Sequence, residues 1–140
     1  VTVLNDSYNA NPESMKAALK TLASMARSSG RRSWAVLSEM GELGTDSVSA
    51  HDEIGRLAVR LNISRLVVVG DAAAPMHTGA SHEGSWGEES VLVPDTDAAV
   101  ALLRDELRSD DVVLVKASKV AEMGRVADAL LAGTGLEGTQ

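Results

Sequence analysis

Apolar and polar positions along the chain form two alternating patterns. Short runs rich in Val, Leu and Ile predict β-strands, and these runs cover residues 1–4, 34–37, 66–69, 91–93 and 112–115. Between the runs, apolar residues recur at intervals of three and four positions, which indicates amphipathic helices. The predicted helices cover residues 12–29, 46–61, 96–107 and 120–131, while 72–90 is irregular and has room for one short helix.

The first predicted helix has the clearest boundaries. Asn11 is a favoured residue for the N-cap and Pro12 for the first helical position, and Gly30 ends the helix. The inward face of this helix is apolar and carries Met15, Ala18, Leu19, Leu22, Met25 and Ala26.

Near-continuous apolar strands that alternate with helices are typical of a parallel sheet covered on both faces. With right-handed crossovers, the prediction is an α/β fold. We expect a three-layer, Rossmann-like domain with a mostly parallel sheet of five or six strands flanked by helices. The sequence shows no internal repeat and no second domain. The domain is expected to cover residues 1–132, and the tail, residues 133–140, is expected to be disordered.

Composition narrows the class of protein. The chain of 140 residues is 44% hydrophobic, with no Phe, one Tyr and two Trp, so its core must be built from aliphatic residues and Met. The net charge of −7 argues against nucleic acid or an anionic membrane as the partner, because both attract clustered cations. No apolar run approaches the roughly 18 residues that cross a bilayer. The absence of Cys excludes disulfides and is compatible with a reducing compartment.

The N-terminus carries no signal-peptide pattern. The chain begins at Val1, within an apparent strand and without an initiator Met. We therefore expect it to be a piece of a longer protein.

Polar residues follow each predicted strand, and the carboxyl ends of strands are where open parallel sheets bind ligands. The polar segments are residues 5–9, Ser38-Glu39, Asp71, Asp95-Thr96 and 116–118. We interpret Asp95-Thr96 as a helix cap. Capping cannot explain so many consecutive polar residues between Asp6 and Asn11, so a binding site is the better interpretation there.

The chain has no glycine-rich phosphate-binding loop. It contains no G-x-x-x-x-G-K-[ST] segment and no Gly-Lys pair, and no G-x-G-x-x-G follows a strand. Although the predicted architecture is Rossmann-like, such a domain cannot by itself hold a triphosphate in the manner of a P-loop.

Three segments carry specific combinations of residues. Residues 6–15 read DSYNANPESM, residues 39–44 read EMGELG and are followed by His51, and residues 113–118 read VLVKAS. In order and position these segments resemble motifs of the C-terminal domain of the Mur ligase family, in particular the branch that adds D-alanyl-D-alanine. Two positions depart from the family pattern, since Ala117 and Lys119 stand where Gly is usual and Arg is frequent.

The resemblance implies one domain of a three-domain, ATP-dependent ligase of peptidoglycan synthesis in the bacterial cytoplasm. The N-terminal domain would bind the UDP-sugar, and the central domain would carry the P-loop and Mg²⁺. The C-terminal domain would close over ATP, contact its adenosine and hold D-alanyl-D-alanine, and it would be inactive alone. ATP would phosphorylate the carboxylate of UDP-N-acetylmuramoyl-tripeptide, and the dipeptide amine would attack the acyl phosphate. No nucleic acid and no membrane insertion are implied.

Four residues of the first motif are candidates for nucleotide binding. Asp6 is the first choice for accepting hydrogen bonds from ribose hydroxyls, since a carboxylate at a strand end can take two of them. Tyr8 lines the adenosine pocket or packs against the domain. Asn9 and Asn11 offer amide groups to adenine or ribose, and Asn11 can serve as the N-cap at the same time.

Four further residues are candidates for substrate binding. Lys116 ends a buried strand, where a charge needs a partner. With Ser118, it is expected to hold the dipeptide carboxylate or the acyl-phosphate end; a salt bridge to Glu39 or Asp6 is the alternative. Glu39 and Glu42 are candidates for orienting the substrate amine, with plain solvation of a Gly-containing loop as the alternative.

The histidines are expected to be structural. His51 lies on the inward stripe of its helix, which favours a core histidine with its hydrogen bonds satisfied over a catalytic one. His77 and His82, with Asp71 and Glu83, match no metal site by their spacing. We expect no catalytic residue and no metal ligand in this chain.

Two other classes of protein remain open. One is another member of the ligase superfamily, of a different Mur or folylpolyglutamate type; the run YNAN at residues 8–11 favours the D-alanyl-D-alanine branch. The other is a free-standing, non-catalytic α/β binding module.

Overall fold

Six parallel strands form one sheet in the order β4-β3-β2-β5-β1-β6. The computed structural model describes residues 1–5, 11–41, 43–84, 89–116 and 137–139. The strands are β1 (Thr2–Asn5), β2 (Ser33–Leu37), β3 (Arg65–Val69), β4 (Ser90–Val93), β5 (Val112–Lys116) and β6 (Glu137–Thr139). The helices are α1 (Pro12–Ser29), α2 (Ser47–Arg60), α3 (Ala74–Glu83) and α4 (Thr96–Glu106), with 3-10 turns η1 (Gly44–Asp46) and η2 (Asp71–Ala73).

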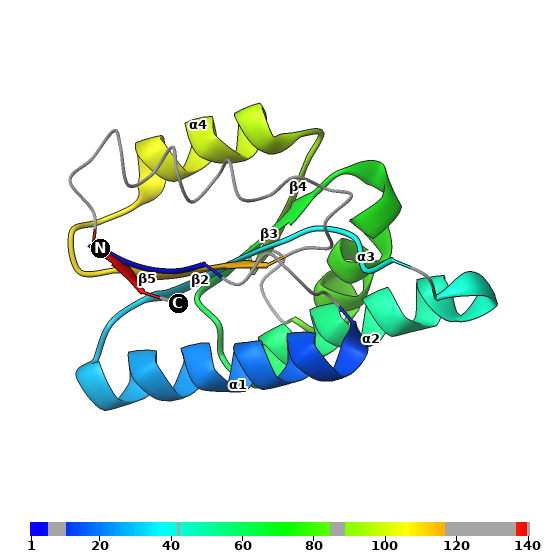
Figure 1. Ribbon diagram of the computed structural model, residues 1–140, viewed down its shortest axis with the longest axis horizontal. Helices are drawn as coiled ribbons and strands as arrows, with labels where there is room; N and C mark the ends of the chain where they lie inside the picture. Colours follow the sequence, from blue (N-terminus) through cyan, green and yellow to red (C-terminus); the bar gives the residue numbers. More distant parts are fainter. Residues whose placement is uncertain (6–10, 42, 85–88, 117–136, 140) are drawn as a thin grey trace.

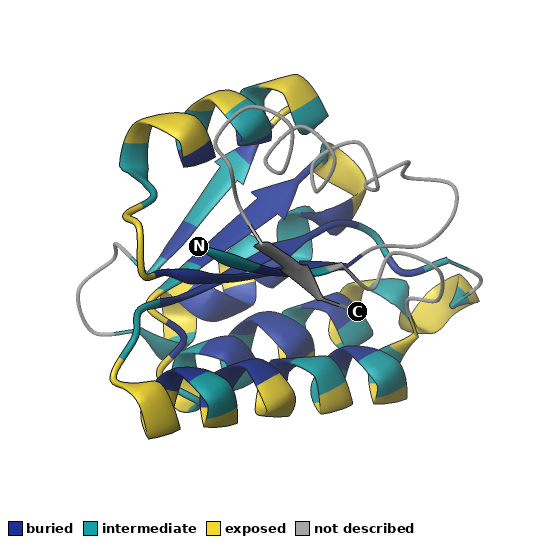
Figure 2. Ribbon diagram, turned by 60° about the vertical axis from the view of Figure 1, so that its left-hand side comes forward, coloured by how far each residue is buried: buried dark blue, intermediate teal, exposed yellow. Residues whose placement is uncertain are grey.

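The helices cover both faces of the sheet, which confirms the predicted three-layer α/β fold. Helices α1, α2 and α3 lie on one face and α4 on the other (Figure 1). Alternate residues of each strand enter the two apolar clusters: Val112 and Leu114 pack with α1 to α3, whereas Val113 and Val115 pack with α4. Each helix turns its buried side to the sheet and its exposed side outward (Figure 2).

Helix α1 begins and ends as the sequence predicts. Asn11 is the N-cap: its Oδ1 accepts a hydrogen bond from the backbone N–H of Ser14 at 2.9 Å, and Ser14 Oγ accepts one from the backbone N–H of Asn11 at 3.1 Å. Gly30 ends the helix with φ of 67°, a left-handed conformation that glycine adopts without a steric penalty. The predicted apolar face supplies Met15, Leu19 and Leu22 to the core.

Strand β5 lies between β1 and β2, although it is the last of the three in the sequence. Its registers pair Asn5 with Val115 on one side and Leu37 with Lys116 on the other. All five residues of β5 are buried. The carboxyl ends of β1, β5 and β2 therefore lie side by side at one edge of the sheet.

Two segments differ from the predictions. Residues 137–139 form β6, which pairs with β1 and so supplies hydrogen-bond partners to a strand that would otherwise be an edge. The prediction of a disordered tail is therefore wrong for these residues; their sequence carries no apolar alternation that would indicate a strand. The irregular stretch 72–90 holds α3, and the helix predicted at 120–131 lies outside the described residues. No described helix is both long and apolar enough to span a membrane.

A buried carboxylate ties the amino ends of the strands together. Asp111, only 2% exposed, accepts hydrogen bonds from Arg32 Nε at 2.9 Å and Nη2 at 2.6 Å, from Trp34 Nε1 at 2.9 Å and from the backbone N–H of Arg108 at 2.9 Å. The Arg32 guanidinium also lies 5.4 Å from the centre of the Trp34 ring. Burial alone would raise the pKa of Asp111, but these hydrogen bonds and the Arg32 charge hold the pKa below its ordinary value.

Helices α2 and α3 approach each other at backbone distance because two glycines lie between them. A Cβ on Gly55 would be 1.9 Å from the carbonyl oxygen of Met76, and one on Gly79 would be 2.3 Å from the carbonyl oxygen of Asp52. Both glycines have ordinary helical φ, so the need for glycine here is one of space and not of backbone conformation.

We predict that Asp111→Asn lowers the free energy of unfolding at neutral pH by about 3 kcal/mol, because it removes a buried carboxylate from its hydrogen bonds to the Arg32 guanidinium. The pKa of Asp111 is lowered in the folded chain. Its contribution is therefore present above the unfolded pKa of about 4 and is lost as the pH falls through the folded pKa. Urea denaturation at several pH values should show the gap between wild type and variant closing below about pH 4. Asp110→Asn, at an exposed neighbour, is the matched control; a gap that does not change with pH would contradict the prediction.

We also predict that Gly55→Ala destabilises the chain by about 2–3 kcal/mol, since a methyl group must push two backbones apart. Gly84→Ala is the control, because the atoms nearest to a Cβ there belong to the flexible carboxylate of Glu89 and not to a backbone. The measurement is the urea midpoint of each variant, and equal midpoints would count against the close-contact argument.

Candidate functional site

Three of the eight predicted site residues fall in the described part of the chain, and all three lie toward the carboxyl edge of the sheet. Lys116 ends β5, Glu39 follows β2, and Asn11 precedes α1. The other predicted positions lie outside the described residues, and they are Asp6, Tyr8, Asn9, Glu42 and Ser118.

The backbone brings the first and third motifs to the same edge. Strands β1 and β5 are parallel neighbours, with Asn5 opposite Val115. The first motif starts directly after Asn5, and Lys116 directly follows Val115. The chain therefore leaves both strands at adjacent points of one rim.

Lys116 is 1% exposed, which is rare for a lysine. Residues two positions apart in a strand point to the same face of the sheet. Lys116 therefore lies on the same face as Val112 and Leu114, which is the face covered by α1. Its backbone carbonyl accepts a hydrogen bond from the N–H of Ser38 at 3.3 Å, which joins the end of β5 to the residue following β2. Lys116 is thus a buried residue at the rim. An ammonium group can stay charged there only if polar or charged groups surround it.

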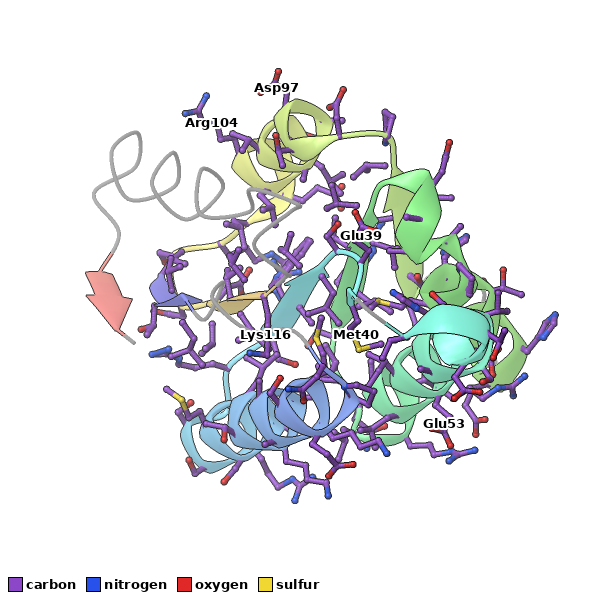
Figure 3. The ribbon with its side chains drawn as sticks, turned by 45° about the vertical axis from the view of Figure 1, so that its right-hand side comes forward. Glu39, Met40, Glu53, Asp97, Arg104 and Lys116 are labelled. Atoms are coloured by element: carbon purple, nitrogen blue, oxygen red, sulfur yellow. The ribbon has the colours of Figure 1, made fainter. Side chains whose placement is uncertain are left out.

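Glu39 is the one residue of 33–40 that is not buried. The residues on either side of it are held: Ser38 Oγ donates to the carbonyl of Val69 at 2.8 Å, and Met40 is 3% exposed within the core. Figure 3 shows Glu39 on the α4 side of the strand ends and Lys116 and Met40 on the α1 side. This arrangement does not support the alternative of a direct Glu39–Lys116 salt bridge.

Two polar residues at the rim are helix caps. Asn11 uses its Oδ1 to cap α1, and its side chain is exposed, so the cap role proposed from the sequence is confirmed. Asp95 Oδ1 accepts from the backbone N–H of Ala98 at 2.8 Å, which confirms the interpretation of Asp95-Thr96 as the start of a helix.

His51 is a core histidine with both ring nitrogens hydrogen-bonded, as expected. It is 1% exposed; its Nδ1 lies 2.6 Å from the carbonyl of Ser47, and its Nε2 accepts from the backbone N–H of Met40 at 2.9 Å. The sequence could not predict its hydrogen bond to the loop after β2, because almost every residue has a backbone N–H, so the residue type does not indicate the partner.

The remaining histidines lie on α3. His77 Nδ1 is 2.7 Å from Ser90 Oγ, a contact between α3 and β4. Within the described ranges, no group of three or more His, Asp or Glu residues is placed to hold a metal ion.

Residues 1–119 match the family model described as Mur ligase, glutamate ligase domain. The chain therefore belongs to the Mur ligase family and represents its C-terminal domain. It is 56% identical, over 94% of its length, to the UDP-N-acetylmuramoyl-tripeptide–D-alanyl-D-alanine ligase of Mycobacterium tuberculosis strain H37Rv, of which it covers 29%. The enzyme of the same name from Escherichia coli K12 is 32% identical over 91% of this chain, which covers 26% of that protein. The chain thus spans less than a third of these relatives.

Solved structures agree with this assignment. MurF from Acinetobacter baumannii superimposes with a TM-score of 0.75 and 25% identity, over 90% of this chain and 27% of that one. MurF from Thermotoga maritima, determined in complex with ADP, gives a TM-score of 0.71 and 25% identity, over 88% of this chain and 26% of that one. The predicted family and fold are both confirmed.

Proposed function

We propose that this chain is the C-terminal domain of a ligase that joins D-alanyl-D-alanine to UDP-N-acetylmuramoyl-tripeptide at the expense of ATP. The observation that carries the proposal is the shared rim of β1 and β5, where the first motif begins and the buried Lys116 ends its strand. The names of the relatives support the substrates. On this proposal the domain supplies contacts to adenosine and to the dipeptide, and it is inactive without the other two domains.

The nucleotide contacts are assigned to the first motif. Asp6 accepts hydrogen bonds from the ribose hydroxyls, Tyr8 lines the adenosine pocket, and Asn9 and Asn11 meet adenine or ribose edges. Asn11 can do so while it caps α1, because the cap engages Oδ1 of an exposed side chain. The ADP complex of the Thermotoga maritima relative supports an adenine nucleotide as the ligand.

The dipeptide contacts are assigned to the other two motifs. Lys116 and Ser118 hold the dipeptide carboxylate or the acyl-phosphate end, since an ammonium and a hydroxyl both donate to anionic oxygens. Glu39 and Glu42 orient the amine. Glu39 and Lys116 lie on opposite sides of the strand ends (Figure 3). This arrangement suits a zwitterionic dipeptide, whose two ends carry opposite charges, better than a ligand with a single charge.

Phosphoryl transfer is assigned to the central domain. Moving a phosphoryl group requires Mg²⁺ and a phosphate-binding loop held in place, and this chain has no Gly-Lys pair. In the proposed reaction the tripeptide carboxylate takes the γ-phosphoryl group of ATP. The dipeptide amine then attacks the acyl phosphate, an amide forms, and phosphate leaves.

The alternative within the family is a ligase for a different amino component. The identity to enzymes of one name, from 56% down to 28% across species as distant as Bacillus subtilis, favours the D-alanyl-D-alanine enzyme. A ligase assay that offers the full-length protein either D-alanyl-D-alanine or single amino acids, glutamate included, distinguishes these two functions.

We predict that Lys116→Met in the full-length ligase raises the KM for D-alanyl-D-alanine about 10- to 100-fold, the value of a lost hydrogen bond to a charged group. The KM for ATP should change little. Met fills a similar volume, so the core stays packed. Lys20→Met, on the exposed side of α1, is the control. An unchanged dipeptide KM in a folded Lys116→Met enzyme removes Lys116 from the substrate site.

We predict the opposite pattern for Asp6→Ala: a KM for ATP raised about 100-fold or more, with the dipeptide KM unchanged, because two ribose hydrogen bonds to a carboxylate are lost. Steady-state kinetics with each substrate varied in turn measures this. Asp105→Ala, on the exposed side of α4, serves as the matched variant. If Asp6→Ala affects dipeptide and nucleotide equally, the assignment of the first motif to adenosine is wrong.

A further inference from the structure

Three hydrogen bonds and one apolar contact fix the loop after β2 around Glu39. Ser38 donates its backbone N–H to the Lys116 carbonyl and its hydroxyl hydrogen to the Val69 carbonyl. Beyond Glu39, the Met40 side chain enters the core, and the Met40 N–H donates to His51 Nε2 at 2.9 Å. The two Ser38 hydrogen bonds hold the loop to neighbouring strands, whereas the Met40 N–H holds it to helix α2.

The hydrogen bonds of His51 define its protonation state. A backbone N–H can only donate, so Nε2 must be the unprotonated acceptor toward Met40. A carbonyl can only accept, so Nδ1, 2.6 Å from the Ser47 carbonyl, must carry the proton. Only the neutral ring with its proton on Nδ1 satisfies both contacts, and the ring is 1% exposed.

The Met40 N–H belongs to the peptide group that joins Glu39 to Met40. This group is planar, so an acceptor that holds the N–H also sets the backbone direction on the Glu39 side. Glu39 has buried neighbours on both sides and is itself partly exposed at the rim. Its carboxylate is therefore presented from a backbone that the imidazole holds in one orientation.

We propose that His51 is a positioning residue for dipeptide binding, acting through the Met40 N–H to hold Glu39 toward the substrate amine. The inference rests on the proposed function, which assigns Glu39 to that amine. His51 is buried on α2 and does not touch substrate, whereas Glu39 lies on the α4 side of the strand ends (Figure 3).

Two substitutions separate the acceptor from the rest of the side chain. His51→Gln places its amide oxygen at the same number of bonds from Cα as Nε2, so it can still accept from Met40. His51→Asn reaches only as far as Nδ1, so it keeps a donor for Ser47 and loses the acceptor for Met40. In the full-length ligase, His51→Asn should raise the KM for D-alanyl-D-alanine about tenfold, with the KM for ATP and for the UDP-sugar unchanged, and His51→Gln should restore it to within about twofold of wild type.

His77→Asn is the matched histidine control, since His77 is partly buried on α3 and bonded to Ser90, away from the rim. It should leave all three KM values unchanged. If His51→Asn and His51→Gln lose thermal stability equally while every KM stays at the wild-type value, His51 only supports the fold and the proposal is overturned.

A direct measurement keeps this test independent of the assigned reaction. With ¹⁵N-methionine labelling, the Met40 amide should exchange with solvent about tenfold faster in His51→Asn than in wild type or His51→Gln, because it loses its acceptor. Equal exchange rates of the Met40 amide in all three proteins would refute the proposed role of the His51–Met40 hydrogen bond. A wild-type enzyme that exchanges as expected but does not ligate D-alanyl-D-alanine would instead refute the proposed function.

Discussion

A buried charge at each end of β5 is the constraint on which both edges of the sheet depend. Asp111 precedes the strand and Lys116 ends it, and they are 2% and 1% exposed. Five residue steps along a strand separate them by roughly 16 Å, too far for the two charges to neutralise each other. Each edge therefore needs its own polar surroundings. At the amino edge Arg32 and Trp34 provide them, and they join the starts of β2 and β5; the carboxyl edge is the one to which we assign the substrates.

The two edges differ in how they are held. Asp111 accepts from a guanidinium, an indole and a backbone N–H, so the amino edge is closed by side chains that meet one another. At the carboxyl edge, most described contacts of the loop after β2 run through backbone groups, which leaves the Glu39 side chain outward. A loop held in this way presents the Glu39 side chain at the rim, as its proposed contact with the dipeptide amine requires.

Periodicity was sufficient to predict strands β1 to β5, helices α1, α2 and α4, and their stacking in three layers. Local chemistry was sufficient for the caps at Asn11 and Asp95 and for a satisfied His51, since a cap and an inward helical stripe depend on nearby residues. The order of the strands could not be predicted, because residues that pair across β1 and β5 are more than a hundred positions apart and their apolar side chains are interchangeable. The same holds for β6 and for the acceptor of the Met40 N–H, which depend on backbone groups common to every residue.

The central place of β5 has a consequence for how the chain can be made. Strands β1 and β2 precede β5 in the chain, and the edges that they turn toward each other stay unpaired until Val112–Lys116 follows, although β2 pairs with β3 on its other side. A nascent or truncated chain that stops before Val112 therefore exposes two facing rows of unpaired N–H and C=O groups in the middle of an otherwise apolar sheet. Such edges pair readily with other chains, so premature termination would yield a self-associating fragment and not a smaller folded domain.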